Sequence, residues 1–152
     1  MVHPKRSPIA LSVVLVFAIL LAACGGGASS SAPGSTPGSN LTGKTWQWQK
    51  TEFNGGKDIP VPNPANYTLL FSPTDNTVAI KADCNSGSGT YTITNGSELT
   101  IKVGAMTLAA CAPDSLSNEF ITELGQVISY KIENNGQLVL ALNTGAGMRY
   151  SP

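Results

Sequence analysis

The densest group of reactive side chains in this sequence lies in the stretch Asp83–Tyr91, and a second group follows at Met106–Cys111. Its serines raise the question of nucleophilic catalysis, which needs an elbow of the form Gly-x-Ser-x-Gly and a base such as histidine. Ser88 does not fit this pattern, because the residue two positions before it is Ser86 rather than glycine. The single histidine, His3, lies near the start of the chain. We therefore expect no catalytic serine.

Metal and paired-carboxylate chemistry have equally little support in the sequence. Asp83 and Asn85 supply only a fragment of the oxygen ligands that a calcium site needs. The other acidic residues are scattered, and no spacing between them recommends a pair for acid–base work. The sequence thus predicts neither catalytic residues nor a metal or other cofactor, and we expect a protein that is not an enzyme.

Cys24 is the first of three cysteines and ends the run Leu21-Ala22-Ala23-Cys24. A basic start with Lys5 and Arg6, and an apolar run over residues 9–21, precede it as in a secretory signal peptide. This run is shorter than the roughly 20 apolar residues of a membrane-spanning helix. The four residues resemble the bacterial lipobox, in which the chain is cut before the cysteine and the thiol is alkylated with diacylglycerol. We expect a signal peptide over residues 1–23 and lipidation of Cys24; the alternatives are an ordinary membrane anchor or a plainly secreted chain.

An anchor at Cys24 would place the protein in the cell envelope, outside the cytoplasm and attached to a membrane by lipid. Gly25 rather than aspartate follows it, so we expect the outer membrane, facing the periplasm, in a bacterium with two membranes. With one membrane we expect the outer face of the cell membrane. Cleavage would also remove His3, Lys5 and Arg6, leaving seven basic residues against nine acidic ones, a net charge of about −2. Such a chain offers no basic surface for nucleic acid.

Cys84 and Cys111 remain as a pair once Cys24 carries lipid. Outside the cytoplasm the environment is oxidising, and an even pair of cysteines there indicates a disulfide. Closing the 27 positions between them would remove roughly 3.5 kcal/mol of unfolded-chain entropy. A redox-active or metal-binding pair is the alternative, although reactive pairs are usually spaced Cys-x-x-Cys and zinc needs four ligands.

Residues 24–40 are expected to form the acylated cysteine and a flexible tether, because 25–40 are rich in glycine, serine and proline and carry no charge. A folded domain is expected over residues 41–152. There, short runs alternate apolar and polar residues, as in strands with one buried face. Asn95-Gly96 and Asn135-Gly136 predict hairpin turns between such runs. The alternating residues are Trp46 and Trp48; Tyr67, Leu69 and Phe71; Val78, Ile80 and Ala82; Tyr91 and Ile93; Leu99, Ile101 and Val103; Ile128, Tyr130 and Ile132; Leu138, Leu140 and Leu142; and Met148 and Tyr150.

One segment, near residues 114–126, has helical rather than strand spacing. Asp114 or Ser115 can cap its start, and Gly125 is expected to loosen or end it. Glu119 and Glu123 are expected to point away from the apolar stripe. The stripe consists of Leu116, Phe120, Leu124 and Val127.

These elements predict a fold that is mainly β (α+β). We expect a compact, antiparallel, partly closed, barrel-like sheet of about eight strands. The single helix would bury its apolar stripe against the open face or mouth of this sheet. Trp46 and Trp48 share one face of a strand and are expected in the core, although such a pair could also form an aromatic platform for a ligand.

The spaced set Cys84-Asn85, Gly89-x-Tyr91, Met106-Thr107 and Cys111, followed by a helix and two strands, resembles the META domain family, also called HslJ-like. The usual opening of that family, Leu-x-Gly-x-x-Trp, is matched by Leu41-Thr42-Gly43-Lys44-Thr45-Trp46. Its Gly-Cys-Asn turn stands here as Asp83-Cys84-Asn85, a departure at the first position. The resemblance covers essentially all of residues 41–152.

The resemblance implies a compact β-rich domain with one helix, often found on bacterial envelope lipoproteins. Some members are heat-inducible or linked to antibiotic tolerance, and no enzymatic activity or established ligand comes with the family. The structural motif that it carries over is Trp46, Asn85, Gly89, Tyr91 and Thr107. It implies that Trp46 lies in the core and that Asn85 and Gly89 form a turn.

We expect a monomeric, non-enzymatic, lipid-anchored envelope protein that binds or buffers envelope components under stress. One alternative is an inhibitor of a cell-wall-degrading enzyme that docks the stiff loop Pro60-Val61-Pro62-Asn63-Pro64. Another is a carrier of small apolar ligands built around Trp46 and Trp48. The expected partners are therefore the membrane, through Cys24, and an unknown envelope protein or small apolar ligand.

Overall fold

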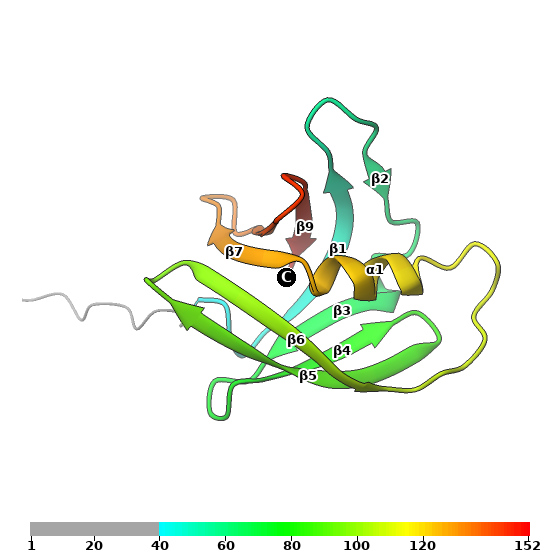
Figure 1. Ribbon diagram of the computed structural model, residues 1–152, viewed down its shortest axis with the longest axis horizontal. Helices are drawn as coiled ribbons and strands as arrows, with labels where there is room; N and C mark the ends of the chain where they lie inside the picture. The colour runs from blue at the N-terminus through cyan, green and yellow to red at the C-terminus, as the bar shows by residue number, and fades with distance from the viewer. Residues whose placement is uncertain (1–39) are drawn as a thin grey trace, which may run out of the picture. The chain divides into compact units, whose positions relative to one another are not determined.

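The computed structural model describes residues 40–152 (Figure 1). The predicted signal peptide, Cys24 and nearly all of the predicted tether lie outside these residues. Within them, no helix is long and apolar enough to cross a membrane. The elements are β1 (Thr45–Glu52), β2 (Ile59–Pro60), the 3-10 helix η1 (Pro64–Asn66), β3 (Tyr67–Phe71), β4 (Thr77–Ala82), β5 (Asn85–Thr94), β6 (Glu98–Met106), α1 (Ser117–Leu124), β7 (Val127–Ile132), β8 (Leu138–Leu142) and β9 (Gly147–Ser151).

The strands form one antiparallel sheet that closes into a ring. Their order is β2-β1-β3-β4-β5-β6-β7-β8-β9, and β9 also pairs with β1. Trp48 lies opposite Tyr150 and Thr51 opposite Met148 across this closing pair. The predicted antiparallel, mainly β fold with one helix is therefore confirmed. Nine strands are described rather than about eight, because the two-residue β2 adds to one edge of β1.

The helix is shorter than the predicted segment 114–126. A turn closed by the Ser115 amide and the Ala112 carbonyl precedes α1. Ser115 Oγ then accepts a hydrogen bond from the Ser117 amide, 3.2 Å away, so it contributes to the helix start. Asp114 makes no capping bond, because the residue at the cap position is Leu116. Gly125 follows the last helical residue, as expected, although its φ of −69° is an ordinary helical value.

The two predicted Asn-Gly hairpins both form, with different turns. Asn95 and Gly96 both have positive φ, 49° and 80°, in a loop of residues 95–97 that joins the paired residues Thr94 and Glu98. At the second hairpin only Gly136 has positive φ, 81°. There the Gly136 amide donates to the Glu133 carbonyl and the Glu133 amide to the Gln137 carbonyl, which makes a longer loop with glycine in the left-handed position.

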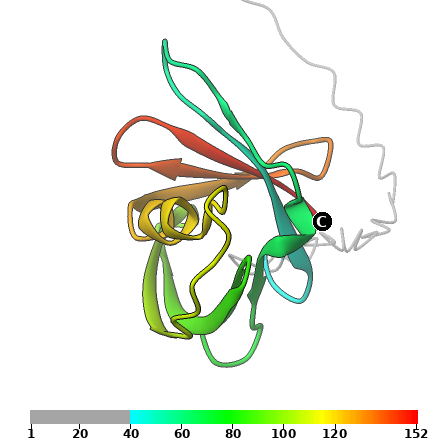
Figure 2. The ribbon, with the colours of Figure 1, turned by 90° about the vertical axis from the view of Figure 1, so that its right-hand side faces the viewer.

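Helix α1 lies where the ring is weakest. Strands β6 and β7 share one paired position, Glu98 with Ser129, and then separate. Figure 2 shows α1 end-on between β5 and β6 on one side and β7 to β9 on the other. Its Phe120 stacks on Trp48 with ring centres 5.1 Å apart, and Tyr67 meets Phe120 edge-on at 5.7 Å. The helix thus fills the interior that the separating strands leave open.

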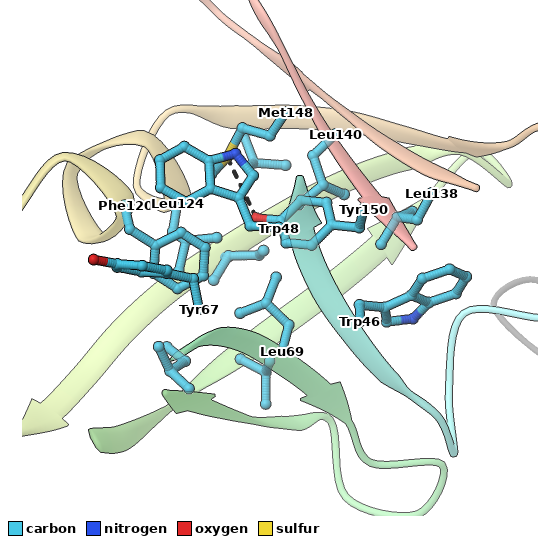
Figure 3. Close-up of a cluster of buried hydrophobic side chains, with 14 of the residues drawn as sticks. Trp46, Trp48, Tyr67, Leu69, Phe120, Leu124, Leu138, Leu140, Met148 and Tyr150 are labelled. Atoms are coloured by element: carbon cyan, nitrogen blue, oxygen red, sulfur yellow. Dashed lines mark hydrogen bonds between the residues drawn. The ribbon is translucent and has the colours of Figure 1, made fainter. Parts of the chain in front are cut away.

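Both tryptophans of β1 are fully buried, as predicted (Figure 3). The indole of Trp46 donates to the Leu41 carbonyl over 2.7 Å. Gly43, between Leu41 and Trp46 in the sequence, has a φ of +76°, which favours glycine. Its amide donates a hydrogen bond to the Phe71 carbonyl. The Leu-x-Gly-x-x-Trp opening is therefore one folded unit that seats Trp46 against the start of the domain.

Charged side chains of alternating sign cross the closing seam between β1 and β9 on the outer face of the sheet. Arg149 contacts Glu52 at 2.6 Å and Glu133 at 2.9 Å. The hydrogen bond from Lys50, followed by that from Arg149, lowers the pKa of Glu52. Half-exposed pairs contribute little individually, so this row mainly favours the correct register of the seam. In order, the row is Asp58, Lys50, Glu52, Arg149, Glu133 and Lys131.

Candidate functional site

The connection from β6 to α1 carries the most exposed large apolar side chain of the described residues. Leu108 is 95% exposed, against 52% for Ile128 and 42% for Leu70. Its neighbours Ala109, Ala110, Ala112 and Pro113 are exposed as well, and residues 103–113 contain no charged side chain. We call residues 107–113 the apolar loop.

Asn85 fixes the apolar loop on both sides of Leu108. Its Oδ1 accepts hydrogen bonds from Thr107 Oγ1 at 3.0 Å and from the Ala109 amide at 2.8 Å. Its Nδ2 donates to the Ala109 carbonyl at 3.1 Å. Asn85 is buried, 8% exposed, so these bonds form in a site with little competing water. The exposed leucine therefore projects from a held backbone.

Thr107 adds a second link between the loop and β5. Its Oγ1 accepts a hydrogen bond from the Ser86 amide at 3.0 Å, and its own amide donates to the Ser86 carbonyl at 2.9 Å. Thr107 Oγ1 therefore accepts from Ser86 and donates to Asn85. A hydroxyl can do both at once, which explains why a threonine stands at this position.

The predicted disulfide between Cys84 and Cys111 is present and provides a third anchor. It joins the β4–β5 turn to the far side of the apolar loop. Asp83, in that turn, has a φ of 60°, in the left-handed region where glycine is favoured. The departure from Gly-Cys-Asn noted in the sequence thus falls on a position where glycine would fit more easily, and Asp83 instead accepts a hydrogen bond from Asn66.

The predicted turn at Asn85 and Gly89 is wrong. Both residues belong to β5, and Gly89 pairs with Val78 on one side and Val103 on the other. Gly89 does not have positive φ. A Cβ there would collide with the Lys102 carbonyl, so the strand needs glycine for space rather than for an unusual backbone conformation.

Three further residues considered as site residues in the sequence belong to the core. Tyr91, 7% exposed, donates from its hydroxyl to the Ser72 carbonyl at 2.7 Å and meets Phe71 edge-on. Trp46 and Trp48 are 0% exposed, so neither offers a ring face at the surface as a ligand platform.

The proline-rich segment predicted as a stiff docking loop is partly built into the sheet. Ile59 and Pro60 form β2, and Val61 is 7% exposed. The Val61 amide donates to the Gln49 carbonyl at 2.9 Å. Pro64 then begins η1. Pro60, Pro62 and Asn63 remain exposed.

Sequence reasoning missed a buried polar chain that ends at Glu123. The Trp48 indole donates to Thr51 Oγ1 at 3.2 Å, and Thr51 Oγ1 donates to Glu123 Oε2 at 2.6 Å. Glu123 is 4% exposed, whereas it was expected to point away from the core. It lies three positions after Phe120 and seven after Leu116, which puts it on their face of the helix. Burial raises its pKa, the hydrogen bond from Thr51 opposes that rise, and the charge of Glu119 adds to it.

Two hollows flank the apolar loop. One is lined by the loop itself, Asn85 and the start of α1. The other lies toward η1 and contains the carboxylates of Asp83 and Asp114. No basic residue lines either hollow.

The polar groups around the loop are engaged in holding it in place. Asn85, Thr107 and the disulfide are occupied with one another and with backbone groups. In residues 40–152, no group of three or more histidine, cysteine or acidic side chains could hold a metal ion. What the site offers is a pre-ordered apolar projection, the kind of feature that binds at low entropic cost.

The sequence model of the META domain matches residues 39–152. Two solved structures share the fold. The first, the NMR structure of a protein from Burkholderia xenovorans, is 19% identical, with a TM-score of 0.60 over 76% of this chain and 87% of that one. The second, the crystal structure of a DUF4847 family protein from Bacteroides vulgatus, is 16% identical, with a TM-score of 0.51 over 70% of this chain and 90% of that one. No curated protein matches the sequence significantly.

Proposed function

Because the chain belongs to the META domain family, we propose that it is a non-enzymatic binding protein of the bacterial cell envelope, held by lipid on Cys24, that uses the apolar loop to dock a partner. The observation that carries this proposal is Leu108, which is 95% exposed yet flanked by two residues bonded to Asn85. An apolar side chain held in water in this way has no evident role in stabilising the fold. It gains free energy only when a partner covers it.

The anchor part of the proposal rests on the lipobox-like run that ends at Cys24. A cysteine carrying two or three acyl chains binds a bilayer firmly, since each buried methylene contributes about 0.8 kcal/mol. Cells producing the full chain should incorporate tritiated palmitate into it, and the Cys24→Ser variant should not. If neither the full chain nor Cys24→Ser is labelled although the protein reaches the envelope, the proposed lipid anchor is wrong. The docking part of the proposal would not be affected.

The docking part is tested with variants that do not disturb the core. Leu108→Asp changes an exposed side chain and should leave the melting temperature within about a degree or two of the parent. Affinity-tagged full-length protein should recover its envelope partners in the parent and in Ile128→Asp, but lose them in Leu108→Asp. If the parent, Ile128→Asp and Leu108→Asp recover the partners equally, the apolar loop is not the docking surface.

A second candidate is an inhibitor of a cell-wall-degrading enzyme, which the held, projecting shape of the loop favours. Pre-ordered loops are well suited to enter an enzyme cleft because little entropy is lost on binding. The purified protein in excess should then slow the lysis of cell walls by such an enzyme, and Leu108→Asp should not. Unchanged lysis with the parent protein excludes the enzyme tested.

A further inference from the structure

The apolar loop lies at the end of the domain opposite the point where the chain enters it. In Figure 1, residues 40–44 lie on the left of the domain, and the segment from β6 to α1 forms its right-hand end. Figure 2, seen from that end, shows the segment on the side of the viewer. The domain therefore presents the loop on the side away from residue 40.

The chemistry of the surface around the loop has two parts. The tip is uncharged and apolar, with Leu108 at its most exposed position. The rim is acidic: Asp83 and Asp114 line the hollow beside the loop, and Glu119 stands exposed in the first turn of α1. The basic side chain beside this region, Lys81, is engaged with the Ala65 carbonyl and Asn66 Oδ1.

An acidic rim decides between two kinds of surface that an apolar tip could enter. Bacterial envelope bilayers that carry anionic lipid repel carboxylates, and the repulsion acts within about a Debye length of the headgroups. A protein cleft with lysine or arginine at its edge attracts the same carboxylates and steers the loop into place. Complementary charge therefore favours a protein.

We infer that the apolar loop inserts Leu108 into an apolar cleft of another envelope protein whose rim is basic, with Asp114 and Glu119 facing that rim. This inference rests on the proposed docking function and names the chemistry of its partner. The occupant is concave, because the loop projects, and it does not need the membrane that holds the chain.

The test uses the full chain in the cells that produce it. A photo-crosslinking amino acid is placed at Ala110, in the exposed part of the loop, and at Leu70, on β3, as the control position. Each is combined with three backgrounds: Leu108→Asp, the pair Asp114→Asn and Glu119→Gln, and Asp75→Asn as a matched neutralisation in the β3–β4 turn. Crosslinking is repeated on envelope preparations at low and high salt, and binding of the purified protein to phosphatidylglycerol vesicles is measured in parallel.

The expected result is a protein adduct from position 110 that is absent from position 70. It should fall about tenfold or more in Leu108→Asp. It should also fall in the Asp114→Asn and Glu119→Gln pair and at high salt, while Asp75→Asn leaves it unchanged.

Three other results overturn the inference, and they separate it from the proposed function. A protein adduct whose yield changes neither in the Asp114→Asn and Glu119→Gln pair nor at high salt contradicts the basic rim of the partner. It remains consistent with the docking function. Vesicle binding that depends on Leu108 would show that the partner is a lipid surface rather than a protein. The docking function would still hold. No adduct at position 110 beyond that at position 70, with no vesicle binding, overturns both proposals.

Discussion

Thr51 and Glu123 lie 72 positions apart in the sequence, and the hydroxyl of the first donates a 2.6 Å hydrogen bond to the carboxylate of the second inside the core. Thr51 is 0% exposed and Glu123 4%. The indole of Trp48 can only donate, so it occupies the Thr51 oxygen as an acceptor and directs the hydroxyl proton to Glu123. This series of hydrogen bonds links α1 to β1, and the direction of each bond is defined.

Replacing Thr51 by valine should destabilise the domain. The change keeps the shape but leaves the Trp48 indole and the Glu123 carboxylate without their shared partner, at a cost of about 1–3 kcal/mol. Urea unfolding followed by tryptophan fluorescence measures it. Thr51→Ser is the matched control, since it keeps the hydroxyl and should lose less than Thr51→Val. Equal losses in the two variants would assign the effect to the missing methyl group instead.

The stability of the domain should carry a pH dependence that belongs to Glu123. Burial raises its pKa above the ordinary 4.5, so the folded state holds the proton more tightly than the unfolded state does. The resulting stabilisation is fully present below about pH 4.5 and is lost as the pH rises through the raised pKa. Glu123→Gln does not titrate there, so its stability relative to the parent should increase from acidic to neutral pH.

Unfolding free energies of the parent and Glu123→Gln, measured in parallel across this range, test the prediction. The comparison is needed because Glu52 and Glu133 have lowered pKa values and act with the opposite sign in both proteins. A constant difference between Glu123→Gln and the parent across this range would show that the Glu123 carboxyl titrates alike in the folded and unfolded states.

The sheet was predictable because its patterns are local. Alternation in runs such as Val78, Ile80 and Ala82 indicates a strand without knowledge of its neighbours, and Asn95-Gly96 marks a turn by its own backbone preference. The disulfide followed from counting cysteines. None of these inferences depends on how distant segments meet.

The remainder depends on contacts that no local pattern contains. The carbonyl of Lys102, on the next strand, is what requires glycine at position 89. Glu123 was expected outside because it is charged, although its spacing from Phe120 places it on the buried face. For Leu108, the run of residues 103–113 without charge was a usable signal, but its exposure follows from the position of Asn85.

Two glycine substitutions should have opposite effects. Gly89→Ala places a methyl group against the Lys102 carbonyl inside a paired strand and should cost about 1–3 kcal/mol or more, because backbone must shift. Gly125→Ala meets only the Thr122 carbonyl at 3.5 Å, at a φ of −69°, and should stabilise by about 0.4–1 kcal/mol. Thermal unfolding of the two variants compares them directly. A tolerated Gly89→Ala would mean that β5 and β6 can separate at this point without loss.

Asn85 and the disulfide should hold the apolar loop as a coupled pair of anchors. Asn85→Ala removes the hydrogen bonds with Thr107 Oγ1, the Ala109 amide and the Ala109 carbonyl, and should cost about 2–4 kcal/mol. Hydrogen exchange at the Ala109 amide should accelerate beyond what the loss of global stability explains. Asn85→Asp, which keeps both acceptor bonds, should protect that amide better than Asn85→Ala does.

A double-mutant cycle tests the coupling of Asn85 to the disulfide, which is removed by Cys84→Ser and Cys111→Ser. The combined loss of stability should differ from the sum of the separate losses by more than about 0.5 kcal/mol, because both anchors restrain the same backbone. Additive losses and an unchanged exchange rate at Ala109 would mean that the loop keeps its shape without either anchor.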